Sequence, residues 1–384
     1  MGFPIKFKIY YLFFYIFPAA LTYLNIYLEG IGISATQIGL MNSVSRALSI
    51  LILPVWGMLA DYFGANKKVL MIALGGTCIF MLSFLLTRVY IVIFIIFILY
   101  TLFRSPSPSL SDALVLNYLE DRSDEYGKYR VWGSLGYMAA VTPFGFLIEQ
   151  TQARILFYLA GGALFITFLI ASRLPKSNKT LEVASLSDFK ILLKNKQLFK
   201  FLILVFILQA PLRSYLIYFP IYFKGAGGGE TLLGIAMVMA SGSELLIFQK
   251  SEKFFEYLSI KNIFIFLAGI FTLRWFLVAI FPLPKILILL QLLHGITFGL
   301  FHVTTVYYIS KIVGDSFEAT GQNLYASTIS IATVVSSLLG GIIYDQLGGS
   351  NLFLLGSIIS LLAGIGCYYN IFISPQVSGE KGEI

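Results

Sequence analysis

The sequence predicts an all-α membrane protein with about twelve transmembrane helices in two pseudo-symmetric bundles of six. Hydrophobic residues make up 58% of the 384 positions and charged residues only 12%, about half the share in soluble proteins. Apolar runs of about 20 residues recur along the whole chain, and each can cross a hydrocarbon core about 30 Å thick. The chain therefore crosses the membrane repeatedly, and no stretch remains for a soluble domain.

The first apolar segment, residues 7–28, is interpreted as a transmembrane helix and not as a signal peptide. It is longer than a signal-peptide core and lacks a small-residue cleavage site. The remaining spans follow at short intervals. They are predicted at residues 37–60, 69–87, 90–118, 129–149, 153–172, 199–223, 231–250, 262–281, 285–310, 320–343 and 351–374.

Basic residues are distributed unevenly between alternate loops. With the N-terminus in the cytoplasm, about 18 Lys and Arg residues fall in inner loops and tails, whereas Arg88, Arg154, Lys224 and Lys285 fall outside. This asymmetry predicts a multi-pass protein of the plasma (inner) membrane with both termini in the cytoplasm. It also accounts for the net charge of +8, so no nucleic-acid partner is expected.

A polar, basic segment at residues 173–198 divides the spans into six and six. We expect an N-terminal bundle at 1–172, a cytoplasmic linker at 173–198 and a C-terminal bundle at 199–384. Two short sequence matches between the halves share an offset of about 195 residues, for example 145–150 with 341–346. Internal repeats of this kind are typical of secondary-transporter folds.

Five ionisable residues lie inside the predicted spans: Asp112, Arg130, Glu244, Arg274 and His294. An Asp or Arg near the bilayer centre costs roughly 2.5–3.5 kcal/mol on insertion scales. Such residues must therefore be paired or face a water-filled cavity. Either arrangement argues against a passive membrane anchor.

Spacing sorts these residues into two sets. Asp112 and Arg130 are equally distant from Asp121 in a polar turn, so nine residues, or about 13 Å of helix, place both at one depth. We expect them to form an ion pair or to share a ligand. Arg274 and His294 are equally distant from Pro284, and ten residues, or about 15 Å, place both near the midplane.

Glu244 lies on the preceding helix and is expected to reach the same cavity as Arg274 and His294. A carboxylate in an apolar site can hold a proton at neutral pH, and an approaching arginine favours its release. Histidine titrates near neutral pH. The pattern therefore favours proton-coupled transport. The alternative is that these groups form fixed ion pairs that join helices.

The other candidates are assigned structural roles or left open. Arg104 precedes two prolines, where a bent helix frees carbonyl groups that need donors. Arg46 either lines a cavity or pairs. His302 lies eight residues after His294, about 80° around a regular helix, and is expected to be a satisfied histidine. Among the aromatic residues, the candidates to test for stacking on a solute are Tyr23, Tyr27 and Tyr137.

No catalytic motif is evident in the sequence. There is no nucleophile–base pair, ATPase motif or metal-ligand spacing, and Cys78 and Cys367 lie in apolar runs. The sequence therefore predicts a protein that is not an enzyme, with no cofactor and no metal. The expected partners are a small-molecule solute, protons and the lipid bilayer, and the chain is expected to be a monomer.

Residues 57–68 resemble the loop signature of the major facilitator superfamily between its second and third helices, with Asn66 where a basic residue is usual. The matching positions are Gly57, Asp61, Gly64, Lys67 and Lys68. The physical interpretation is a tight turn at the glycines and an aspartate that caps or pairs at a helix end. The resemblance implies the major facilitator fold and a conformational role for this loop.

Finer motifs resemble the lactose permease and phenylpropionate permease branch. Residues 129–137 resemble the start of the fifth helix, which implies that Asp112, Arg130 and Tyr137 contact substrate. Residues 242–246, Arg274 and residues 291–294 resemble parts of the eighth, ninth and tenth helices. They imply substrate contact for Glu244 and His294, and proton coupling through Glu244, Arg274 and His294.

One departure from the branch is Thr297, which stands where lactose permease has a proton-carrying glutamate. Either Glu244 or His294 then takes the proton, or the coupling is altered. The implied function is proton symport of a small organic solute such as a sugar, nucleoside or aromatic acid. The alternatives are a drug/proton antiporter, for which residues 143–145 match the export pattern in part, and a non-transporting membrane sensor.

Overall fold

A computed structural model of the chain describes residues 3–62, 66–175, 191–192, 194–314 and 317–373. Within these residues all regular secondary structure is helical, and twelve helical segments are long and apolar enough to cross a membrane. The predicted all-α fold with twelve spans is therefore confirmed. The chain divides into two compact units, Met1–Glu182 with Gly229–Ile235, and Val183–Gly228 with Ala236–Ile384.

Unit 1 is built around its first span, which packs on the fifth and sixth spans. Small residues allow this close approach, since a Cβ on Gly136 would lie 2.9 Å from the carbonyl carbon of Leu12. The helices of unit 1 are α1 (Phe3–Leu21), α2 (Leu24–Gly30), α3 (Ala35–Tyr62), α4 (Asn66–Ser83), α5 (Tyr90–Arg104), α6 (Ser107–Leu119), α7 (Tyr126–Gln150) and α8 (Ile155–Ser172).

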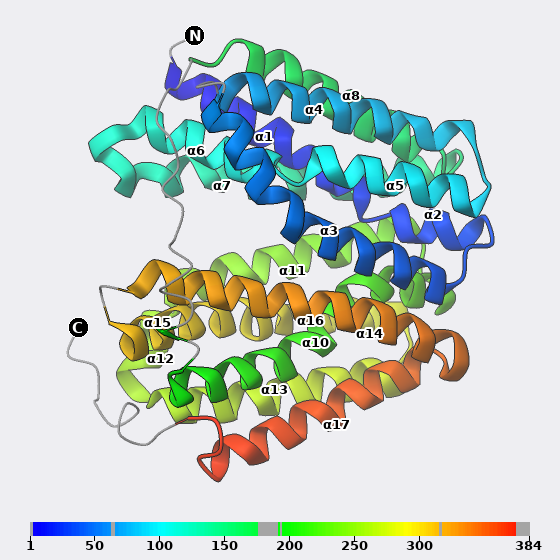
Figure 1. Cartoon of the computed structure of the whole chain (residues 1–384). Coiled ribbons are helices and arrows are strands. Elements are labelled where there is room, and N and C mark those ends of the chain that lie inside the picture. Colours follow the sequence, from blue (N-terminus) through cyan, green and yellow to red (C-terminus); the bar gives the residue numbers. More distant parts are fainter. Residues whose placement is uncertain (1–2, 63–65, 176–190, 193, 315–316, 374–384) are drawn as a thin grey trace. The chain divides into compact units, whose positions relative to one another are not determined.

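Unit 2 repeats the same helix pairings. The third and sixth spans of unit 1, α4 and α8, pack together, and so do the third and sixth spans of unit 2, α13 and α17 (Figure 1). The first and fifth spans pair as α1 with α7 in unit 1 and as α10 with α16 in unit 2. The helices of unit 2 are α10 (Lys196–Gly225), α11 (Glu230–Lys250), α12 (Glu252–Tyr257), α13 (Ile260–Ile280), α14 (Pro284–Leu289), α15 (Phe301–Val313), α16 (Glu318–Leu347) and α17 (Gly349–Tyr368). Of these, the first turn of α11 belongs to unit 1.

The fourth and tenth spans are both interrupted. The fourth bends between Arg104 and Ser107, as its prolines predict. The tenth passes from α14 through a 3₁₀ turn (Leu290–Leu293) and a π-helical stretch (Gly295–Leu300) before it continues as α15. No proline marks the π stretch, so the sequence did not predict it.

One local prediction is wrong. Gly57 was expected in a tight turn, but α3 continues through it to Tyr62. A glycine inside a helix costs only about 1 kcal/mol relative to alanine, which a long apolar span can absorb.

Lys67 of the loop motif contacts the end of α8. Its Nζ donates to the carbonyl oxygens of Ser172, at 2.7 Å, and Leu174, at 2.5 Å.

Parts of the loop motif and of the predicted linker lie outside the described residues. These parts are Gly64, the side chain of Asp61, and residues 176–190 and 193 of the predicted linker 173–198. Lys68 of the motif is exposed.

Candidate functional site

Asp112 lies on α6 of unit 1 and is held by a tyrosine of α1. The hydroxyl of Tyr11 donates to Oδ1 of Asp112 at 2.7 Å. The neighbouring Tyr10 and Ser111 hydroxyls form the adjacent hydrogen bond, at 2.6 Å. The half-buried carboxylate keeps further acceptor positions, because a carboxylate can accept about four hydrogen bonds.

Arg130 lies on α7, and its guanidinium stacks on a second tyrosine of α1. Its Cζ is 4.1 Å from the ring centroid of Tyr15, one helical turn from Tyr11. Asp112 and Arg130 do not form the predicted direct ion pair within 4 Å in the described part of the chain. The reason is that α1 places Tyr11 and Tyr15 against these two side chains. A shared ligand remains a prediction.

The three tyrosines expected to stack on a solute differ in their surroundings. The hydroxyl of Tyr137 lies 3.1 Å from Oγ1 of Thr22, and its ring is half-buried two turns beyond Arg130. Tyr23 donates to the carbonyl of Val141 at 2.6 Å and is buried. The ring of Tyr27 is buried edge-on against Phe157. Tyr23 and Tyr27 are buried in unit 1, and stacking on a solute stays a prediction for all three tyrosines.

Arg274 is the most deeply buried ionisable residue of the candidate set, with 0% exposure. Its Nη1 donates to Oγ1 of Thr297 at 2.5 Å, and its Nη2 donates to Oε1 of Gln291 at 3.3 Å. The guanidinium carbon lies 4.7 Å from the ring centroid of Tyr215 and 4.9 Å from that of Trp275. Among the described residues no carboxylate lies within 4 Å of Arg274. A buried cation is therefore held by neutral groups only.

His294 completes the contacts of Arg274, as the hairpin symmetry predicts. Nδ1 of His294 lies 3.3 Å from Nη1 of Arg274. Because a guanidinium can only donate, Nδ1 must accept, and the imidazole proton of neutral His294 is then on Nε2. A proton on Nδ1 would set two donors against each other and remove this hydrogen bond.

Glu244 lies half-buried on α11, beside the π-helical stretch. A Cβ on Gly299 would lie 3.7 Å from Cγ of Glu244, and a Cβ on Gly295 would lie 2.6 Å from the backbone carbon of Ser243. Oγ of Ser243 accepts from the Gly295 amide at 2.9 Å. The two glycines thus bring the backbone of the tenth span close to α11, which places Glu244 near the helix that carries His294.

The π-helical stretch changes the position of His302. A π-helical turn contains more residues than an α-helical turn, because its hydrogen bonds join residues five apart. Side chains four positions apart can therefore stack along one side of the helix. The ring planes of His294 and Phe298 lie within 6° of parallel, and those of Phe298 and His302 within 9°. Nδ1 of His302 lies 3.1 Å from the hydroxyl of Tyr325. His302 is hydrogen-bonded as predicted, and the ring of Phe298 stacks between it and His294.

The remaining arginines of the spans have different surroundings. The guanidinium of Arg104 lies 5.6 Å from the ring centroid of Phe14 and 5.5 Å from that of Phe17. Within the described part of the chain it makes these ring contacts and no hydrogen bond to a carbonyl group freed by the bend. Nε of Arg213 donates to Oε1 of Gln209 at 3.1 Å, and Arg46 is exposed on α3.

Sequence reasoning missed the neutral residues that hold the charges. Tyr11, Tyr15 and Tyr215 hold charged side chains in the structure but were not among the predicted site residues. Gln291 was noted only as part of a motif, although its Nε2 donates to the hydroxyl of Tyr215 and its Oε1 accepts from Arg274. Spacing alone could not separate these residues from ordinary core residues.

The model of the MFS_1 like family matches residues 5–355. The chain belongs to this family of the major facilitator superfamily. The predicted resemblance is thereby confirmed, and the chain is a multi-pass membrane protein and a secondary transporter of small solutes.

Curated relatives and solved structures agree with this membership. The chain is 26% identical to the maltose permease of Geobacillus stearothermophilus, over 90% of this chain and 89% of the relative. It is 24% identical to the probable 3-phenylpropionic acid transporter of Escherichia coli, over 96% of each. The crystal structure of nucleoside transporter NupG superposes with a TM-score of 0.85 over 97% of this chain and 99% of that chain. At 18% identity that likeness shows the fold alone.

Proposed function

We propose that this transporter takes up a small organic solute together with protons, by alternating access of its two six-helix bundles. In this proposal Asp112, Arg130 and Tyr137 of unit 1 hold the solute together with Glu244 and His294 of unit 2. Coupling to protons runs through Glu244, His294 and Arg274. We further propose a monomer without catalytic activity, in the plasma (inner) membrane with both termini in the cytoplasm.

The observation that carries the proposal is the burial of Arg274 among neutral groups. A buried guanidinium without a carboxylate partner is costly, and that cost falls when an ionised carboxylate approaches. Glu244 lies on α11, against the tenth span that carries His294, and is a suitable partner. A conformation that brings Glu244 to Arg274 would release its proton, and one that separates them would allow the proton to return.

His294 supplies the link between solute and proton. Because Nδ1 of His294 accepts from Arg274, any movement of the guanidinium changes the hydrogen bonding of the imidazole. A solute that binds Nε2–H would therefore affect the position of Arg274. Thr297 accepts a hydrogen bond from Arg274 but has no carboxyl group to carry a proton. We therefore assign the transported proton to Glu244. His294 would link the protonation of Glu244 to solute binding.

The charge balance of the spans favours an acidic solute among the three classes expected. Five arginines lie within the spans: Arg46, Arg104, Arg130, Arg213 and Arg274. The carboxylates at comparable depth are only two, Asp112 and Glu244. A substrate carboxylate would offset this excess and can bind a guanidinium through two hydrogen bonds. The 3-phenylpropionic acid transporter among the relatives is consistent with an aromatic acid.

The test begins with a thermal-shift panel of 3-phenylpropionate, its neutral amide, maltose and a nucleoside, applied to the purified protein. Uptake of any solute that binds is then measured in proteoliposomes with an imposed pH gradient. We expect accumulation against the solute gradient by the wild type and by the control Glu256→Gln, an exposed carboxylate of α12. We expect Glu244→Gln to exchange the solute without accumulating it, and accumulation by that variant would refute the proposal.

The same vesicles separate the alternatives. A drug/proton antiporter would require the opposite orientation of the pH gradient to accumulate its substrate. A non-transporting sensor would bind a solute in the thermal-shift panel but give no flux with purified protein alone.

A further inference from the structure

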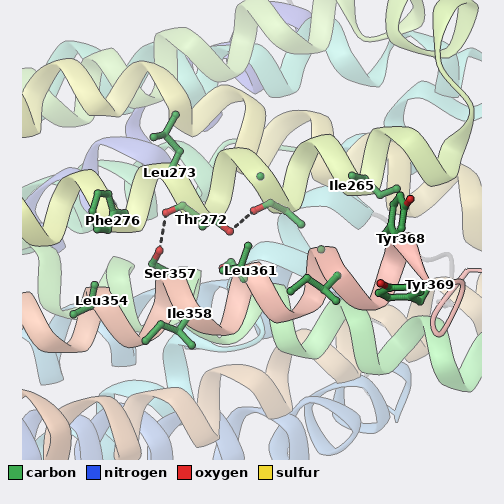
Figure 2. A pocket seen from close by; sticks show the side chains of 15 residues that line it. Ile265, Thr272, Leu273, Phe276, Leu354, Ser357, Ile358, Leu361, Tyr368 and Tyr369 are labelled. Carbon is green, nitrogen blue, oxygen red and sulfur yellow. Dashed lines mark hydrogen bonds between the residues drawn. The ribbon is translucent and has the colours of Figure 1, made fainter.

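A groove lined mainly by apolar side chains runs between α13 and α17 on the surface of unit 2 (Figure 2). Its volume is about 820 Å³. On α13 its lining extends from Ile265 to Phe276, which is about 17 Å of helix. Half of the hydrocarbon core is about 15 Å thick. The groove thus has the length of the acyl chains in one leaflet.

The lining residues suit a flexible hydrocarbon chain. Leu273, Ile358 and Leu361 are exposed along the groove, with between 47% and 51% of their surface accessible. Gly269 also lines the groove, and an added Cβ there would meet no atom within 4 Å. Oγ of Ser357 donates to the carbonyl of Thr272 at 2.9 Å, so this hydroxyl is satisfied within the protein. The groove therefore offers open, apolar space.

One end of the groove is basic. Tyr368 and Tyr369 line this end, and Nζ of Lys261 lies 5.9 Å from the ring centroid of Tyr368. The chain continues directly into a second pocket of about 280 Å³, which Lys196 and Lys200 line together with residues 370–373. Among the described residues no carboxylate lies within 4 Å of these three lysines.

We propose that this groove and the three lysines form a binding site for an anionic phospholipid. The acyl chain would lie between α13 and α17, and the phosphate would contact Lys261, Lys196 and Lys200. Basic pockets beside transmembrane helices on the cytoplasmic side bind anionic head groups, and tyrosines favour the same interfacial depth. The topology proposed above places this end of unit 2 at the cytoplasmic leaflet. The lipid site does not depend on the identity of the solute.

The test measures binding of phosphatidylglycerol and of phosphatidylcholine with identical acyl chains to the full-length protein, by native mass spectrometry. We expect tighter binding of phosphatidylglycerol by the wild type. We expect the triple variant Lys196→Gln, Lys200→Gln, Lys261→Gln to lose at least tenfold in affinity for phosphatidylglycerol. The matched control is Lys250→Gln, Lys253→Gln, Lys311→Gln, which removes three lysines from elsewhere at the same end of unit 2.

A second variant tests the groove itself. Gly269→Leu adds a side chain at a position where a Cβ meets no atom within 4 Å, and it is expected to lower affinity for phosphatidylglycerol at least fivefold, with all lysines intact. Equal binding of the two lipids by the wild type would overturn the proposal. So would an equal loss in the control triple variant, or unchanged phosphatidylglycerol binding by Gly269→Leu.

Discussion

Arg130 of unit 1 and Arg274 of unit 2 both lie within membrane-spanning segments, but their surroundings differ. Arg130 is half-buried, with its guanidinium on one tyrosine ring. Arg274 is fully buried, with two rings against it and hydrogen bonds to Thr297, Gln291 and His294. Arg130 keeps donors available for a ligand, whereas the donors of Arg274 are largely used within the protein.

This difference indicates a division of labour between the two units. A guanidinium with available donors suits recognition of a solute carboxylate, which arrives and leaves in every cycle. A guanidinium inside a network of neutral acceptors suits a role in which a nearby carboxylate changes its protonation. Four substitutions test the comparison, from the largest expected effect to the smallest.

Replacement of Arg274 tests whether unit 2 carries the coupling. We expect Arg274→Gln to lower accumulation of the solute about 100-fold or more, because hydrogen bonds from a charged donor contribute about 1.5–3 kcal/mol each. Thermal stability should stay within a few degrees, since loss of a buried uncompensated cation offsets the lost bonds. Proteoliposome uptake and melting temperature measure the two effects, with the exposed Arg122→Gln as control. Wild-type accumulation by Arg274→Gln would contradict the division of labour.

Replacement of Arg130 tests whether unit 1 recognises the solute. We expect Arg130→Gln to raise KM about tenfold while the maximal rate of accumulation changes little. Arg130→Lys should recover part of the affinity, because it restores charge without the two-pronged hydrogen bonding. Initial uptake rates over a range of solute concentrations distinguish the two parameters. A fall in the maximal rate with unchanged KM would indicate that Arg130 takes part in proton coupling and not in solute recognition.

The hydroxyl of Tyr215 tests how far the network around Arg274 extends. Tyr215→Phe removes the partner of Gln291 and leaves the ring beneath the guanidinium, so we expect about a fivefold lower accumulation. Tyr222→Phe is the matched control, because its hydroxyl bonds the carbonyl of Val278 in the same unit without contact to Arg274. Equal transport defects in the two variants would show a general packing effect.

The hydroxyl of Tyr11 provides the smallest test, in unit 1. Tyr11→Phe removes the donor to Asp112, and we expect about a threefold change in KM with unchanged coupling. Tyr10→Phe, which removes the neighbouring bond to Ser111, should leave KM unchanged. An effect of Tyr11→Phe on the pH dependence of accumulation would show that Asp112 takes part in proton coupling.

The sequence predicted the depth and grouping of the charged residues better than their partners. Equal distance from a turn placed Arg274 and His294 together, and the 3.3 Å separation of their nitrogens confirms it. The same reasoning allowed a direct ion pair between Asp112 and Arg130, which the described part of the structure does not contain. Spacing within the hairpin could not include the tyrosines of α1, about a hundred residues away, which contact both side chains. The angle given for His302 assumed a regular helix, whereas residues 295–300 form a π-helical stretch.

Apolar run length and composition alone determined the twelve spans, because each run must cross a hydrocarbon core of fixed thickness. Turn symmetry determined the depth of each charge, because rise per residue is constant in a helix. Only the tertiary structure decided that Arg274 is held by Thr297, Gln291 and His294, and that α1 supplies the contacts of Asp112 and Arg130. These contacts join helices that are distant in the chain. Each span is apolar on all sides, so the sequence does not show which face packs on which neighbour, and only helix packing decides it.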